Sequence, residues 1–226
     1  MEYPIETINY KGYEIEIGQD DDLEDPRQWD DFSIMFCSHG RYTLGDRDLK
    51  KEMTDTNITG SYENIIDYCS SWIEVEKYLI KAYDPIVILP LYLYDHSGVR
   101  MKVGSFQGYL PQGHAEFDSG QVGFILVTKE RAKKEYNITE GKRISKKLKN
   151  KVAEILQSEV DTYDKYISGQ VYEYYSEAGS CSGFYDYEEM ISEAKQEIDR
   201  EIEDKKQKKQ ARVKSLIKSK VALIHR

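Results

Sequence analysis

Two nearly continuous apolar runs constrain the fold more than any other feature of this chain. They are IVILPLYLY at Ile86–Tyr94 and QVGFILVT at Gln121–Thr128. Runs of this length and composition are typical of strands that are covered on both faces of a sheet. Pro90 lies inside the first run, and because proline cannot donate to the hydrogen-bond ladder, we expect a bulge or a departure from the sheet there.

Three further segments carry strand signals. Residues Gly12–Gly18 alternate apolar and acidic side chains, which predicts a strand with one dry face. Phe32–Cys37 is a short buried strand or the start of a helix, and periodicity does not decide between them. Gly169–Tyr175 is predicted to be a strand, and Ala178–Gly183 is predicted to be a turn.

Helical spacing of apolar residues predicts four helices. They cover Ser61–Tyr83 with Ser61 as cap, Lys129–Tyr136, Glu140–Val160, and one long helix from Tyr187 onward. The predicted fold class is therefore α+β, with a mostly antiparallel sheet covered by the amphipathic helices that start at Ser61 and Glu140. The long C-terminal helix is expected to be an assembly or docking arm, so the predicted division is an α+β domain at 1–185 and a helical arm at 186–226.

Composition limits the partners of the chain. The 226 residues carry a net charge of -9, and direct binding of nucleic acid by such a surface is disfavoured. No apolar run approaches the roughly 20 residues that span a bilayer, and the N-terminus lacks the pattern of a signal peptide. We therefore expect a protein of the host-cell cytoplasm that binds no membrane. The cysteines Cys37, Cys69 and Cys181 are too dispersed for a disulfide framework or a zinc cluster, and are expected to be reduced, buried or half-buried thiols.

Acidic and tyrosine-rich segments suggest an interaction surface. Tyrosine offers a large contact area and a polar tip, which suits interfaces, and acidic groups can occupy a basic groove on a partner. The residues expected to bind such a partner are Asp20, Asp21, Asp22, Glu24, Asp25, Tyr92, Tyr94, Asp95, His96, Tyr172, Tyr174 and Tyr175. The alternatives are that the acidic surface serves solubility and that the tyrosines pad the edges of a sheet. The acidic loop is predicted to be solvated, although its oxygens could also hold a cation such as calcium.

The candidates for catalysis lie between the two apolar runs. Asp95, His96 and Ser97 are adjacent, but neighbouring residues of a strand point to opposite faces, so Asp118 or Ser119 would have to complete a catalytic group. The preferred role of Asp95 and His96 is to stabilise a turn.

Metal and phosphate sites have weaker support. His39, His96 and His114 lack the spacing of a zinc motif, and the glycine-rich segment GSFQGYLPQG lacks the lysine and serine of a phosphate-binding loop. No cofactor and no metal are therefore predicted, and the glycine-rich segment is interpreted as a hairpin turn.

Several segments together resemble a family of uncharacterised proteins carried by bacteriophages, prophages and plasmids. They are PRQWDDFSIMFCSHGRYTLGD, LPLYLYDHSG, DSGQVGFILVTKE, YDKYISGQVYEYY and CSGFYDYE, within Gly12–Glu189. The segment SFQGYLPQGHAEFDSG departs from the shorter, tryptophan-bearing version expected before DSGQVG. The family brings no assigned activity or catalytic residues, so the resemblance implies only a mobile-element accessory protein.

The function expected from these features is inhibition of a bacterial defence complex, of the anti-CRISPR or anti-restriction type, without enzymatic activity. The partner would be a host defence protein or nuclease with a basic surface. One alternative is a small hydrolase or nucleotide-modifying enzyme centred on His96 and Asp118. Another is a structural or assembly protein of the mobile element, in which the C-terminal helix forms a homo-oligomer.

Overall fold

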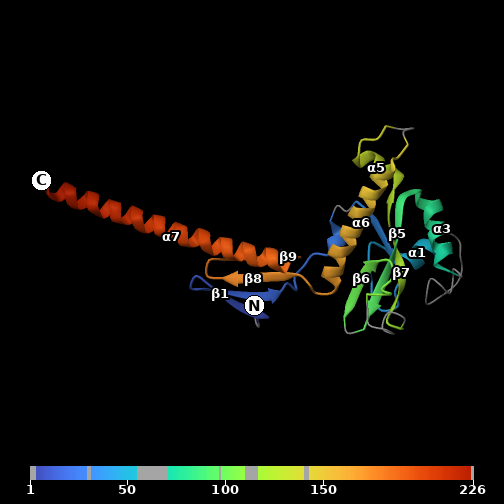
Figure 1. The fold of residues 1–226 in the computed structure, drawn as a ribbon, viewed down its shortest axis with the longest axis horizontal. Coiled ribbons are helices and arrows are strands. Elements are labelled where there is room, and N and C mark those ends of the chain that lie inside the picture. The colour runs from blue at the N-terminus through green and yellow to red at the C-terminus, as the bar shows by residue number, and fades with distance from the viewer. Residues whose placement is uncertain are drawn as a thin grey trace. The chain divides into compact units, whose positions relative to one another are not determined.

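The chain folds into two compact units, each with its own sheet (Figure 1). A computed structural model describes residues 4–29, 32–54, 71–96, 98–109, 117–139 and 143–224. The first unit contains residues 1–23 and 169–226, and the second contains residues 24–168. The division therefore falls at 23/24 and 168/169 and not at the predicted boundary 185/186, because the C-terminal helix packs on the sheet of the first unit.

The second unit is built on a five-stranded sheet of order β4-β3-β7-β5-β6. All neighbours are antiparallel except the short parallel pair of β3 and β4. The strands are β3 (Ile34–Cys37), β4 (Arg47–Asp48), β5 (Pro85–Asp95), β6 (Val99–Val103) and β7 (Ser119–Thr128). The two apolar runs are β5 and β7, which are covered on both faces as the sequence predicted, and the structure pairs them with each other near the middle of the sheet.

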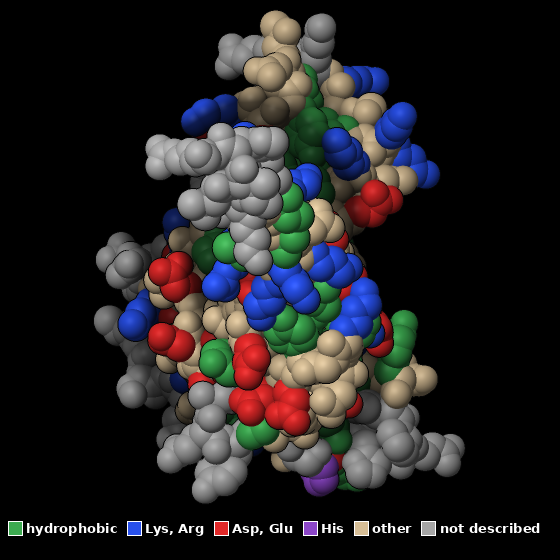
Figure 2. All heavy atoms as spheres, turned by 90° about the vertical axis from the view of Figure 1, so that its left-hand side faces the viewer, with side chains coloured by type: hydrophobic (Ala, Val, Ile, Leu, Met, Phe, Trp, Pro, Cys, Tyr) green, Lys and Arg blue, Asp and Glu red, His purple; other side chains and the backbone are tan. Residues whose placement is uncertain are grey.

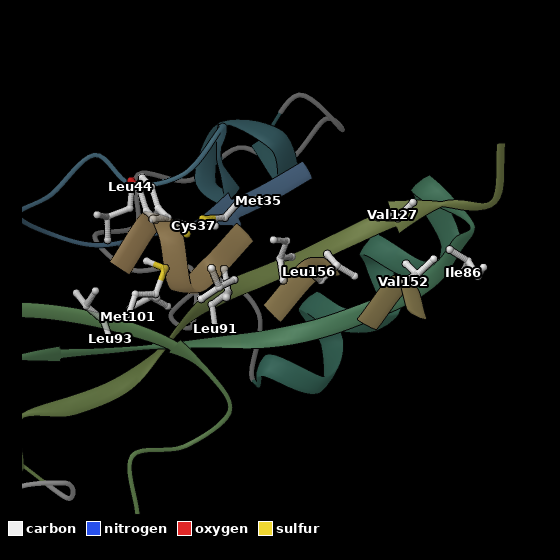
Figure 3. Packing of buried hydrophobic residues seen from close by; sticks show 14 of the residues in the cluster. Met35, Cys37, Leu44, Ile86, Leu91, Leu93, Met101, Val127, Val152 and Leu156 are labelled. Atoms are coloured by element: carbon white, nitrogen blue, oxygen red, sulfur yellow. The ribbon is translucent and has the colours of Figure 1, made fainter. Parts of the chain in front are cut away.

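Helices cover both faces of this sheet (Figure 1). They are α1 (Leu49–Thr54), α3 (Trp72–Tyr83), α5 (Lys129–Glu135) and α6 (Lys146–Ile167). On one face Val152, Leu156 and Val160 of α6 pack against residues of β3, β5, β6 and β7 (Figure 3). On the other face Leu49, Met53, Val75 and Leu79 of α1 and α3 pack against Phe36, Phe124 and Leu126.

The two predicted covering helices are present, but their boundaries differ from the prediction, and the second helix ends at Ile167 and not at Val160. The predicted start at Ser61 lies outside the described residues, but α3 begins only at Trp72, because Ser71 has an extended backbone. The second helix begins at Lys146 and not at Glu140, because the Ser145 hydroxyl accepts the Leu148 N–H at 3.2 Å and caps the helix there.

The bulge expected near Pro90 is also present. The register between β5 and β7 shifts between Leu91 and Tyr92, directly after the proline. The Pro90 carbonyl still accepts a hydrogen bond from the Gly104 N–H at 2.9 Å. Pro90 itself stays in register with Phe124, and the irregularity follows one residue later, where Val122 of β7 is the extra residue.

A buried arginine joins three segments of the second unit. The Arg27 side chain is only 2% exposed and lies in the 3-10 helix η1 (Pro26–Gln28). Its guanidinium donates to both carboxylate oxygens of Asp46, at 2.9 and 2.7 Å, and to Glu159 at 3.0 Å. The Asp46 carboxylate also accepts the Met35 N–H at 2.7 Å. This network holds η1 against β3 and α6, so the second half of the acidic loop is fixed by ion pairs.

The first unit has a four-stranded antiparallel sheet of order β1-β2-β8-β9. The strands are β1 (Glu6–Tyr10), β2 (Tyr13–Gln19), β8 (Tyr172–Ser176) and β9 (Gly179–Phe184). The predicted strands at Gly12–Gly18 and Gly169–Tyr175 are thereby confirmed as β2 and β8. The prediction of a turn at Ala178–Gly183 was wrong, because most of this segment pairs with β8 as a strand.

The long C-terminal helix α7 (Tyr187–Ile224) covers one face of this sheet with its first half. Met190, Ile191, Ala194 and Ile198 are buried against Ile15, Ile17 and Tyr174. Every described side chain from Glu203 to Lys218 is exposed. Nowhere in the described part of the chain is a helix both long and apolar enough to cross a bilayer.

Candidate functional site

Polar side chains meet at one edge of the five-stranded sheet. β3 and β5 run in the same direction on either side of β7, so their C-terminal ends lie beside the N-terminal end of β7. The loop after β3 carries His39, Arg41 and Tyr42, and β5 ends in Asp95. The backbone N–H of Asp95 donates to the Asp118 carbonyl at 2.9 Å, which continues the pairing of β5 with the chain before β7.

Asp95 holds the loop that follows β3. Its carboxylate accepts hydrogen bonds from the Arg41 guanidinium and, at 3.3 Å, from the Tyr42 hydroxyl. The Tyr42 ring stacks on the His39 ring at a centroid distance of 5.1 Å. Asp95 therefore stabilises the loop after β3.

Burial favours the neutral form of His39. Desolvation is the main cause that lowers its pKa below 6.5, and it outweighs the neighbouring carboxylate of Asp95. The Arg41 backbone N–H donates to His39 Nδ1 at 3.3 Å, so the proton of the neutral ring belongs on Nε2. His39 is thus better suited to donate a hydrogen bond to a ligand than to act as a base.

The structure brings together the two residues proposed for hydrolytic chemistry. His96 Nδ1 lies 3.4 Å from Asp118 Oδ2, which is within ion-pair distance when the ring is protonated. A pocket of about 600 Å³ adjoins them, and its lining includes Ser38, His39, Arg41, Asp95, Asp118 and Ser119. Asp118 lines the pocket whereas His96 does not, and His96 is 53% exposed. Ser97 lies outside the described residues.

The metal hypothesis receives no support from the described residues. No group of three metal-binding side chains occurs among them. His114, one of the proposed ligands, lies outside this part of the chain. In the acidic loop, Asp20 accepts the Gly183 N–H at 2.9 Å and Asp25 accepts the Arg27 N–H at 2.9 Å, so both carboxylates stabilise the backbone.

The residues proposed for partner binding are divided between the two units. Asp20, Asp21, Asp22, Tyr172, Tyr174 and Tyr175 belong to the first unit, whereas Glu24, Asp25, Tyr92, Tyr94, Asp95 and His96 belong to the second. Tyr92 and Tyr94 are half-buried in β5, and the Tyr94 ring contacts that of Phe106 at 5.9 Å.

One of the proposed tyrosines is buried, which corrects the prediction. Tyr174 is only 3% exposed and packs beneath α7, and Tyr172 lies on the same side with its ring against Tyr187. Tyr175 points the other way and is 54% exposed. Side chains alternate along a strand, so only one of these neighbours could reach solvent.

The alternation that exposes Tyr175 also assembles an acidic face that the sequence did not single out. Ile15 and Ile17 of β2 face α7, so Glu14 and Glu16 point to the opposite side of the sheet, as does Glu173 of β8. Glu16 lies directly opposite Tyr175 in the register of β2 and β8. We call Glu14, Glu16, Glu173 and Tyr175 the acidic face. Its signal was present in the predicted alternation of Gly12–Gly18.

The cysteines follow the prediction in part. Cys37 is a buried free thiol, and desolvation strongly raises its pKa. Cys181 is also free, but it is exposed at β9 and not buried or half-buried as expected. Cys69 lies outside the described residues.

No family model, curated protein or solved structure matches the chain. The function must therefore be argued from its own surfaces.

Proposed function

We propose that this chain is an accessory protein of a mobile genetic element that binds and inhibits a bacterial defence complex in the cytoplasm of the host. The observation that carries the proposal is the acidic face of the first unit. The sequence resemblance to phage and plasmid proteins supplies the biological setting, and the partner would be a nuclease or effector with a basic surface.

The acidic face has the physical properties of a docking surface. Within the described part of the chain, Glu14, Glu16 and Glu173 have no ion-pair partner. Uncompensated charges of one sign attract a basic partner over a distance and raise the rate of association. The exposed Tyr175 ring beside Glu16 offers apolar contact area of the kind that is enriched at the centres of interfaces.

A titration of a purified defence nuclease with the full chain tests the proposal. A bound inhibitor stops the nuclease at a fixed molar ratio, and the inhibition weakens with salt because charge steers the association. The variant Glu16→Lys/Glu173→Lys should raise the inhibitory concentration at least about tenfold. The matched control is Glu135→Lys/Glu154→Lys, which changes the net charge equally on exposed positions of α5 and α6.

Two results would contradict this function. The first is inhibition that is unchanged when the acidic face is reversed. The second is loss of nuclease activity at far less than one chain per nuclease, because only a catalyst can act at such a ratio.

The pair of His96 and Asp118 supports a second candidate function, a small hydrolase or nucleotide-modifying enzyme. The supporting observation is their 3.4 Å separation beside the pocket of about 600 Å³. His96→Ala should then abolish the biological effect while leaving the fold intact. Full activity of that variant would eliminate the enzyme and leave the binding protein.

A further inference from the structure

The second half of α7 differs from the rest of the chain in charge and exposure. We call Lys205–Ile224 the arm. It carries eight Lys or Arg residues, and no Asp or Glu follows Asp204. Figure 2 shows Lys and Arg side chains on both sides of apolar ones at this end of α7, nearest the viewer. The net charge of -9 therefore hides a strongly basic segment.

The arm also exposes an apolar stripe. Val213 and Ile217 are one helical turn apart and are 47% and 58% exposed, with Leu216 beside them at 54%. This stripe continues the helical spacing of Ile191 and Ile198, which are buried against the sheet. Arg212 and Lys214 flank it in the helical arrangement.

Repulsion between like charges weakens the arm as a helix. Lys208 and Arg212 are four residues apart, as are Lys214 and Lys218, and like charges at this spacing destabilise a helix. Lys205 pairs with Glu201 at 3.2 Å and Lys206 with Glu203 at 3.8 Å. From Lys208 to Lys218 no basic residue has an ion pair within the described part of the chain.

We propose that the arm of one copy docks on the acidic face of a second copy. The two surfaces are complementary: the arm offers lysines and an apolar stripe, and the face offers three carboxylates around the exposed ring of Tyr175. The phosphates of a nucleic acid could pair with the lysines, but they would make no apolar contact with Val213 and Ile217. Two arms pairing with each other would bring like charges together along the whole contact.

Docking between copies follows from the geometry of the first unit. α7 is one continuous helix that packs on the side of the sheet opposite to the acidic face. The arm extends beyond Ile202, the last α7 residue that packs on the sheet core, so it cannot reach its own acidic face without breaking the helix. A reciprocal exchange of arms would close into a two-fold pair.

Docking of the arm on the acidic face also bears on the proposed function, because it would cover the face assigned to the defence complex. Self-association and partner binding would then compete. This competition rests on the proposed function, whereas the docking itself does not.

A charge-swap experiment tests the docking. Sedimentation velocity of the full chain should show a concentration-dependent dimer that weakens with salt. The face variant Glu16→Lys/Glu173→Lys and the arm variant Lys208→Glu/Lys209→Glu should each raise the dissociation constant at least about tenfold. Mixing the two variants should give a heterodimer that is tighter than the homodimer of either variant, because the intact arm of the face variant then meets the intact acidic face of the arm variant.

Control variants separate docking of the arm on the acidic face from a general effect of net charge. The variants Glu135→Lys/Glu154→Lys and Lys146→Glu/Lys149→Glu place equal charge changes on the second unit and should leave the dimer unchanged. Val213→Ser/Ile217→Ser keeps every charge and should also weaken the dimer, because it removes the apolar stripe. Circular dichroism checks that each variant folds.

Four results would overturn the inference. They are a wild-type chain that is monomeric at all concentrations, a dimer insensitive to the face variant, a dimer insensitive to the arm variant, and mixed variants that fail to associate. A dimer that depends on the arm alone would indicate pairing of arms. Inhibition of a nuclease that is lost in the face variant but kept in the arm variant would support the proposed function separately.

Discussion

The buried Arg27 gives the sharpest prediction about stability. In Arg27→Met the side-chain volume is nearly kept, but Asp46 and Glu159 lose the guanidinium that bonds both of them. Removing one partner of a buried ion pair typically costs about 3–5 kcal/mol, because the remaining charge stays buried without compensation. The Arg27 side chain is 2% exposed, but Asp46 and Glu159 are 21% and 15% exposed, so the middle of this range, about 4 kcal/mol, applies.

Tryptophan fluorescence during urea unfolding measures this loss in the relevant unit. The two tryptophans of the chain, Trp29 and Trp72, both belong to the second unit. With a slope of roughly 2 kcal/mol per molar urea, the loss corresponds to a midpoint shift of about 2 M. Total stability of a unit of this length is roughly 7–20 kcal/mol, so the variant remains folded without urea.

A control variant and a second substitution test whether the ion pairs of Arg27 contribute to stability as buried pairs do. Lys129→Met removes an exposed ion pair with Asp84 and should cost at most about 1 kcal/mol. Glu159→Gln should lower the free energy of unfolding less in the Arg27→Met background than in the wild-type chain. In that background it removes a charge that has already lost its partner. If Arg27→Met shifts the midpoint no more than Lys129→Met does, the network is solvated and the argument fails.

Three further predictions concern single sites. Gly123→Ala should destabilise the second unit by about 3 kcal/mol or more in the same urea assay, because its Cβ would lie 1.8 Å from the Phe36 carbonyl oxygen. Cys181 should react with a thiol reagent in the native protein, whereas Cys37 should react only after unfolding, since burial raises its pKa. Desolvation lowers the pKa of His39, so its NMR signals should titrate below pH 6.5. The unfolded chain takes up that proton first, so this residue makes the protein less stable as the pH falls below 6.5.

Patterns that depend on near neighbours were readable from the sequence. The apolar runs predicted β5 and β7, and the spacing of apolar residues predicted α6 and α7. The segment GSCSGF lacks branched apolar residues and became a strand only because β8 provides its partner.

Features that depend on distant partners were not readable. Arg27 stands in an acidic loop that looks solvated, and its partners lie 19 and 132 residues away. For the same reason, the sequence did not show which of the adjacent tyrosines Tyr174 and Tyr175 is exposed to solvent. Which of them reaches solvent depends on the face that α7 covers, and α7 follows later in the chain.

The distribution of charge changes how the composition should be interpreted. A net charge of -9 suggested one acidic surface and a basic partner. The sum combines an arm with no acidic residue and a body that is correspondingly more acidic than the total indicates. The stripe residue Ile217 lies about 20 Å along the helix from Asp204, about two Debye lengths at physiological salt. At that distance the end of the arm is screened from its own acidic body, so its charges can attract the acidic face of another copy.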